Sequence, residues 1–287
     1  MNYRLIGQAM RRLQIYAAMV YFSPEYDEEL MAAGLEPGVM CYFGGRAAAM
    51  GAVPASVIHA AFYNFNPERV RENIPKAWTL ASPEKLLEAR LMAADRALKR
   101  LLGSEVLGSP QVAEAAGLAR RAAMSAATEG RPLAASHQEL DWPDSPHLVL
   151  WQGLAILREH RGDGHIAALI NAELGGLQSM VSHAATGSGF LPSFAQSHRG
   201  WSGEQWNNAA EELRVRGVLD ADGALTEQGT ALRAGLEEDT DRLAAGPWRV
   251  LGDAGAQQLA EIGGELSTAL VAAGCLPAED VFFPAKR

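Results

Sequence analysis

The sequence predicts a mainly α-helical protein of two helical domains, with a winged helix-turn-helix and a short β-hairpin wing in its C-terminal half. Apolar residues recur at helical spacing along most of the 287 residues, and strand-like runs are few. One pattern of helix, turn, helix, hairpin and helix follows residue 190. With 48% apolar and 21% charged residues, the chain can bury a sizeable core.

Helices account for most of the N-terminal half. A first long helix opens at Pro83 and covers 85–102, where Leu86 and Leu98 fall on the apolar face. An Ala-rich helix follows at 111–129. The apolar run 39–43, VMCYF, fits either a strand or a helix.

A segment rich in proline marks the predicted domain boundary. It holds three prolines, two aspartates and two serines, a composition typical of an ordered linker. We therefore predict an N-terminal helical domain at 1–130, a linker at 131–146 and a C-terminal domain at 147–287.

Two helices are expected directly after this linker, at 147–160 and 165–183. Gly162 and Gly164 predict a break between them, with Asp163 as the N-cap of the second helix.

The helix-turn-helix pattern spans 190–243. A short helix at 191–198 and a turn at 200–202 precede a helix that Ser202 caps and that runs to residue 216. Two short apolar pairs flank the turn 220–223, which predicts a tight hairpin, and Thr226 is expected to cap the last helix.

Several strings carry a resemblance to known proteins. RGVLDADGALTEQGTAL at 216–232 is similar to the wing of MarR-like regulators. LREHRGDGHIAAL at 157–169, YFSPE at 21–25, FYNFNPERV at 62–70 and GRPLAA at 130–135 together resemble an actinobacterial family of winged-helix, MarR-like proteins. The resemblance implies a winged-helix fold over nearly the whole chain. It implies no particular reaction and assigns no catalytic residue.

A cluster of titratable residues lies within the string LREHRGDGHIAAL, and His183 follows one helix later. We predict that Arg161, Asp163, His165 and His183 line a ligand pocket, with His160 beside them. A helix N-terminus favours an anion, an arginine can hold a carboxylate or phosphate, and a histidine beside an aspartate can act as a general base. A purely structural bend, with Asp163 as a cap, is the alternative. The spacing does not suit a helix-borne metal site, so no metal is predicted.

A second candidate group lies in the N-terminal half, within FYNFNP at 62–67. Tyr63 and Asn64 are predicted to approach the pocket, with Arg46 facing the same space. The alternative is core packing, in which Asn66 caps a helix that begins at Pro67.

The predicted recognition helix gives weak support for DNA binding. Gln205 and Asn208 suit base edges, and Arg214 and Arg216 suit phosphates. However, residues 101–287 carry 13 basic and 24 acidic side chains, a net charge of −11. Because duplex binding depends on phosphate neutralisation, this charge disfavours DNA as a partner.

The remaining observations bound the function. Two cysteines cannot form a disulfide framework. We expect a cytoplasmic protein with no signal peptide and no membrane span. We expect no cofactor, since no phosphate-binding loop is present. We predict a small-molecule-binding, ligand-responsive regulator. An enzyme acting on a small anionic metabolite and a protein-interaction module are the alternatives, and a homodimer is left open.

Overall fold

A computed structural model describes residues 3–277 and 281–283. Within these ranges the chain is mainly helical, and β structure is limited to two isolated antiparallel bridges. The mainly α class is therefore confirmed.

The first half forms α1 and a layer of short helices, followed by two long ones. The bounds are α1 Tyr3–Ala18, η1 Met19–Phe22, α2 Pro24–Ala32, α3 Val39–Ala47, η2 Ala48–Met50, α4 Ala55–Phe62, α5 Pro67–Asn73, α6 Lys76–Leu80, α7 Pro83–Leu107 and α8 Pro110–Met124. The ambiguous run 39–43 is thus helical, at the start of α3. Asn66 caps α5, as the core-packing alternative expects, its side chain accepting from the Glu68 backbone N–H.

The second half contains the longest helix, the helix-turn-helix segment and a closing helix. The bounds are α9 Pro132–Gln138, α10 Pro146–Asn171, α11 Gly176–Ala184, α12 Pro192–Arg199, α13 Gly203–Val215, α14 Glu227–Ala244, η3 Gly246–Leu251 and α15 Gly252–Ala272. Ser202 and Thr226 cap α13 and α14 as predicted.

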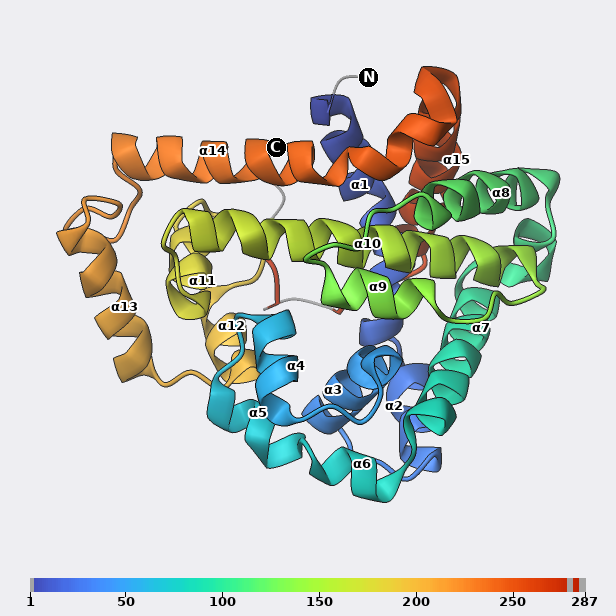
Figure 1. The fold of residues 1–287 in the computed structure, drawn as a ribbon, viewed down its shortest axis with the longest axis horizontal. Helices are drawn as coiled ribbons and strands as arrows, with labels where there is room; N and C mark the ends of the chain where they lie inside the picture. The colour runs from blue at the N-terminus through green and yellow to red at the C-terminus, as the bar shows by residue number, and fades with distance from the viewer. Residues whose placement is uncertain (1–2, 278–280, 284–287) are drawn as a thin grey trace.

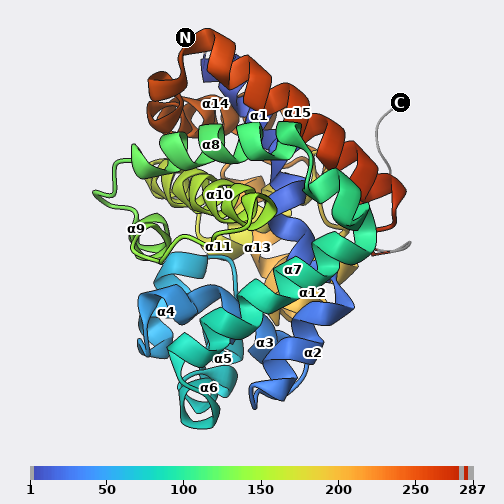
Figure 2. The ribbon, with the colours of Figure 1, turned by 90° about the vertical axis from the view of Figure 1, so that its right-hand side faces the viewer.

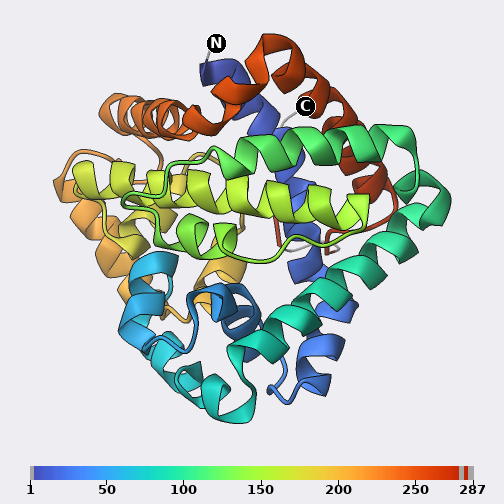
Figure 3. The ribbon, with the colours of Figure 1, turned by 45° about the vertical axis from the view of Figure 1, so that its right-hand side comes forward.

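Helix α10 is the centre of the fold. Helix α14 packs along one side of it, and α8 and α9 pack along others (Figure 1). Figure 2 shows α15 beside α1 and α8, so the last helix covers the first. The short helices α2–α6 form a layer beneath α10, and α7 connects that layer to α8 (Figure 3).

The largest hydrophobic core draws on both sides of the predicted linker. It joins Leu13 of α1 and Leu98 of α7 to Ile156 of α10 and Leu259 of α15. A smaller core forms around Leu213 of α13, at the end of the molecule that carries the helix-turn-helix. The domain boundaries 1–130, 131–146 and 147–287 stay a prediction. The larger core contains residues from both sides of the predicted linker.

The predicted break at 162–164 is wrong. Helix α10 continues through both glycines to Asn171, and the chain turns at 172–175 instead. The small residue at 164 serves close packing: a Cβ there would lie 2.7 Å from Arg131 Nη1 and 3.3 Å from Leu243 Cβ. Asp163 therefore lies inside a helix and does not cap one.

The predicted β-hairpin wing is not formed as strands in the described chain. One bridge joins Leu219 to Leu225, and the Asp220 N–H donates to the Ala224 carbonyl at 2.9 Å. The Asp220 side chain accepts from the N–H groups of Asp222 and Ala224, which closes the turn early. Only a single residue pair is left to bridge, so no ladder develops.

Candidate functional site

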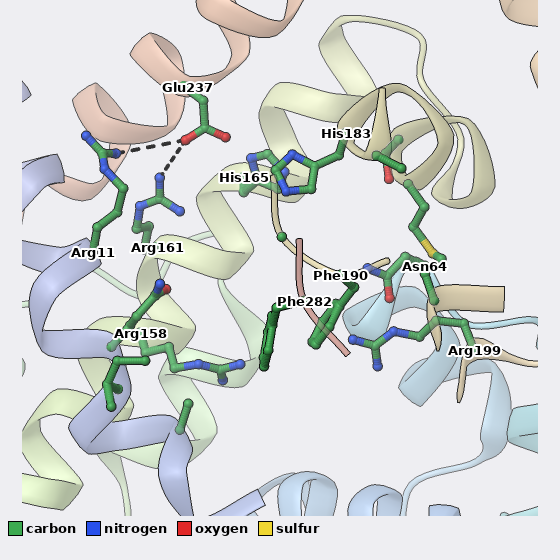
Figure 4. A pocket seen from close by; sticks show the side chains of 18 of the residues that line it. Arg11, Asn64, Arg158, Arg161, His165, His183, Phe190, Arg199, Glu237 and Phe282 are labelled. Atoms are coloured by element: carbon green, nitrogen blue, oxygen red, sulfur yellow. Dashed lines mark hydrogen bonds and ion pairs between the residues drawn. The ribbon is translucent and has the colours of Figure 1, made fainter. Parts of the chain in front are cut away.

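A cavity of about 470 Å³ lies where the helix-turn-helix meets the main helices. Its walls come from α1, α10, α11, α12, α14 and the segment 281–283 (Figure 4). The lining residues on which the argument depends are Arg11, Phe22, Asn64, Arg158, Arg161, His165, His183, Phe190, Arg199, Arg233, Glu237 and Phe282.

Arginines from four helices supply the cations of this cavity. On α10, Arg158, Arg161 and His165 are spaced i, i+3 and i+7, which places them on one helical face. Arg161 pairs with Glu237 at 3.0 Å and with Asp241 at 3.2 Å, both on α14. These carboxylates hold the guanidinium against α14 and leave part of it facing the cavity.

Several buried guanidinium nitrogens make no hydrogen bond within the described chain. They are Nε of Arg161, Nη1 of Arg199, and Nε and Nη1 of Arg233. A buried donor without an acceptor costs about 1–3 kcal/mol, and more when it is charged. The arginines that carry these nitrogens line the cavity, and an anionic ligand there would offset their positive charge.

Two neutral histidines line the upper part of the cavity as it is seen in Figure 4. His165 Nδ1 lies 2.8 Å from the Thr240 hydroxyl, which itself donates to the Leu236 carbonyl. Nδ1 is therefore the donor, and Nε2 keeps its lone pair. Burial, with Arg161 and Arg233 nearby, lowers the pKa of His165 to about 4.

His183 is held in the opposite tautomer. Arg233 Nη2 donates to His183 Nδ1 at 3.1 Å, so the proton of the neutral ring lies on Nε2. Burial and then the Arg233 charge lower the pKa of His183. The two rings, adjacent in Figure 4, thus offer one acceptor and one donor.

An aromatic wall lies between the upper and lower parts of the cavity. Phe190 and Phe282 stack with ring centroids 5.0 Å apart, and Phe22 meets Phe282 edge-on at 5.9 Å. The Leu191 N–H donates to the Val281 carbonyl at 2.9 Å, which fixes the segment that carries Phe282. A planar apolar group would find complementary surface here.

The structure brings together four of the residues predicted from the sequence. Arg161, His165, His183 and Asn64 all line the cavity, with Asn64 approaching from the N-terminal half. A role for them in ligand binding stays a prediction.

Asp163 and His160 do not line the cavity. The Asp163 carboxylate accepts from the Ala134 N–H at 3.0 Å, at the start of α9, and burial raises its pKa to about 6. His160 is also buried, and its backbone carbonyl accepts from Arg131. Both residues face away because an unbroken α10 places them on other sides of the helix.

Tyr63 and Arg46 have structural partners of their own. The Tyr63 hydroxyl donates to the Leu174 carbonyl at 2.6 Å, holding the turn after α10. Arg46 forms a two-point ion pair with the buried Glu159. Arg46 Nη1 also donates to the Tyr42 hydroxyl at 3.0 Å, and neither residue lines the cavity.

Sequence reasoning missed Arg11, Arg158, Arg199, Arg233, Glu237 and the aromatic pair. For Arg158, the signal was its spacing from Arg161 and His165, which the expected helix break concealed. Arg199 and Arg233 are far apart in the sequence, and no local pattern connects them.

The four candidate DNA contacts lie on or beside α13, and three of them have intramolecular partners. Gln205 accepts from the Ser202 N–H in a capping box, and Arg214 donates to the Asp220 carbonyl. Arg216 donates to the Glu173 and Ala172 carbonyls, closing the end of α10. Asn208 is exposed.

Of the helices within the described ranges, none combines the length and apolar character that a bilayer span requires. Over the same residues, His, Cys, Asp and Glu nowhere gather in a group of three or more that could hold a metal ion.

Comparison with known proteins identifies one match. No curated protein and no solved structure matches this chain. The model of a helix-turn-helix family matches residues 6–277, nearly the whole length. Together with α12, the turn at 200–202 and α13, this match shows that the chain belongs to that helix-turn-helix family.

Proposed function

We propose that this chain is a ligand-responsive, MarR-like regulator that binds a small anionic molecule in the arginine-lined cavity. One observation carries the proposal: the helix-turn-helix itself supplies part of the cavity wall. Ala195 and Arg199 of α12 line it, as do Arg233 and Glu237 of α14. A ligand that contacts these residues therefore acts directly on the elements that position α13.

Helix α14 connects the cavity to the predicted wing. Its first turn is tied to the segment after α13, because the Thr226 hydroxyl donates to the Gly217 carbonyl at 2.6 Å. Gly229 packs so closely on that segment that a Cβ would lie 2.1 Å from the Val218 carbonyl oxygen. One turn further along, Arg233 reaches the cavity. A shift of α14 on ligand binding would thus move the wing with it.

Helix α12 is anchored at the cavity in a similar way. The Asn66 N–H donates to the Arg199 carbonyl at 2.9 Å, and Trp201 Nε1 donates to the Asn64 carbonyl at 2.8 Å. The turn between α12 and α13 therefore rests on the N-terminal half, and Asn64 and Arg199 share the cavity.

The second candidate function is an enzyme acting on a small anionic metabolite. The observation that favours it is His165 of the cavity wall, whose unprotonated Nε2 can accept a proton from a bound substrate. Turnover of a bound anion without any response of α13 would support this candidate over the regulator.

Hydrogen–deuterium exchange with phenyl phosphate as the probe tests the regulator. We expect slower exchange across 192–226 and α14 in the wild type. Arg233→Gln should lose the response, whereas Arg242→Gln should keep it, because Arg242 is exposed and pairs with Asp239 on the same helix. Saturable binding without any change in 192–226 would contradict a ligand-responsive helix-turn-helix.

A further inference from the structure

The lower end of the cavity in Figure 4, around Arg158 and Arg199, is called its floor here. The charges at this floor are unbalanced. Arg46 and Arg158 both pair with Glu159, at 2.6 and 2.7 Å, and this carboxylate is almost fully buried. Arg199 forms no ion pair with any described residue and lies over the ring of Phe65, with its guanidinium carbon 4.1 Å from the ring centroid. Three cations thus lie near a single carboxylate, which pairs with Arg46 and Arg158 but not with Arg199, and the excess is two positive charges.

The upper part of the cavity is closer to neutrality. Arg11 and Arg161 face Asp241 at 3.2 Å, and Arg161 also meets Glu237. Arg233 lies 3.8 Å from Glu237. Because the histidines here are uncharged, this end offers mainly hydrogen bonds, and the strongest attraction for an anion lies at the floor.

From these charges we infer that the floor, between Arg158 and Arg199, is a subsite for a dianionic group of the phosphate monoester type. The apolar part of the ligand would lie against Phe190 and Phe282. In Figure 4 the guanidinium groups of Arg158 and Arg199 point inward on either side of this aromatic pair. Both arginines line the cavity, and Arg199 Nη1 is a buried donor without an acceptor. This inference rests on the proposed function.

Tyr42 lies among the same arginines and reports on their charge. Burial raises the pKa of its hydroxyl, but Arg46, Arg199 and Arg158 together outweigh this effect, so the pKa lies below its usual value. The groups that face Tyr42 are Arg46, Arg158, Glu159, Arg199, the ring of His198, and the hydroxyls of Tyr21 and Tyr26. A dianion bound beside Arg199 would oppose ionisation and raise this pKa.

Ultraviolet absorbance of tyrosinate, followed during an alkaline titration, measures this effect in the full chain. The Tyr42→Phe variant identifies the signal. Phenyl phosphate is a dianion above pH 7, since its second pKa is about 6. We expect phenyl phosphate to raise the pKa of Tyr42. It should also bind at least about tenfold more tightly than the monoanion benzoate, because it carries two negative charges instead of one.

Variants separate the subsite from a general loss of structure. Arg199→Gln should abolish the effect of phenyl phosphate on Tyr42, and Arg199→Lys, which keeps the charge, should retain part of it. Arg71→Gln is the matched control, because Arg71 is exposed and pairs with Glu68. Inorganic phosphate serves as a second probe that lacks the apolar part, and it should bind more weakly than phenyl phosphate.

The outcomes distinguish this inference from the proposed function. Phenyl phosphate that binds and protects 192–226, yet leaves the titration of Tyr42 unchanged, overturns the dianion subsite and leaves the regulator standing. A raised pKa of Tyr42 without protection of 192–226 supports the subsite and contradicts the regulator. Binding of neither phosphate probe overturns the inference.

Discussion

Arg46 and Glu159 are 113 residues apart in the sequence and form a two-point ion pair between α3 and α10. Nε lies 3.0 Å from Oε1, and Nη2 lies 2.6 Å from Oε2. Burial opposes ionisation of Glu159, but Arg46 and Arg158 outweigh it and hold the pKa of this carboxyl well below its usual value. The pair joins the layer of short helices to the central helix, and Glu159 also pairs with Arg158, which lines the cavity.

Replacing Glu159 by Gln should destabilise the protein strongly. The change leaves Arg46 and Arg158 without a counter-charge, and breaking one side of a buried pair costs about 3–5 kcal/mol. Urea denaturation followed by circular dichroism measures the loss. The control Glu238→Gln removes an exposed partner of Arg4 and should change the free energy of unfolding little. Equal stability of both variants would show that the buried pair is dispensable.

Asp163→Asn should make the protein more stable at pH 8 but not at pH 4. Burial raises the folded-state pKa of Asp163 to about 6, above its unfolded value, so ionisation destabilises the fold as the pH rises through this range. Asn stays neutral, and its carbonyl oxygen can still accept from Ala134.

The measurement is the free energy of unfolding of the variant relative to wild type, determined at both pH values. We expect the difference to grow by about 1–3 kcal/mol from pH 4 to pH 8. The exposed Asp222→Asn should show no such trend. A difference that is the same at both pH values would mean that the charge of Asp163 does not destabilise the fold. Loss of ligand binding in the variant would show that Asp163 belongs to the ligand site.

The fold was predictable wherever the signal was local. Ser202 and Thr226 cap α13 and α14 as their types and positions indicate, and the helical periodicity gave the mainly α class. The break at Gly162 and Gly164 was wrong because glycine also permits close packing, and at Gly164 Arg131 and Leu243 of α14 approach the helix. Whether a glycine breaks a helix or permits close packing depends on tertiary contacts, which the local sequence does not record.

The cavity was predictable only in part for a related reason. Arg161, His165 and Asn64 stand out as polar residues in distinctive strings. Arg199 ends the short helix α12 and Arg233 lies within the 18-residue helix α14, and neither position stands out in the sequence. They meet at one cavity because α12 packs against α11 while α14 packs against α10 and α11, and a single sequence does not reveal that arrangement.

The contact between Gly229 and Val218 gives a test of the connection through α14. Gly229→Ala should cost about 1–3 kcal/mol, because its Cβ would lie 2.1 Å from a backbone oxygen that cannot yield easily. Gly235→Ala on the same helix has open space and should be neutral or stabilising by up to about 1 kcal/mol.

Thermal denaturation measures stability, and hydrogen exchange in α13 measures the connection. If Gly229→Ala transmits ligand binding to α13 as wild type does, the close contact is not the route. Gly235→Ala should transmit it unchanged.

Random duplex DNA should bind only weakly. Residues 101–287 have a net charge of −11, and Arg214 and Arg216 already donate to backbone carbonyls. Fluorescence anisotropy at near-physiological salt should give a Kd weaker than about 10 µM. Sub-micromolar binding to random sequence would contradict the charge argument. Tight binding to one sequence, with a shallow salt dependence, would support the regulator.

A crystal structure of the protein grown with saturating phenyl phosphate tests the central claim most directly. The phosphate is predicted to lie within hydrogen-bond distance of Arg158 and Arg199, with the phenyl ring against Phe190 and Phe282. Phenyl phosphate bound elsewhere on the molecule, with the arginine-lined cavity holding only water, would contradict the account.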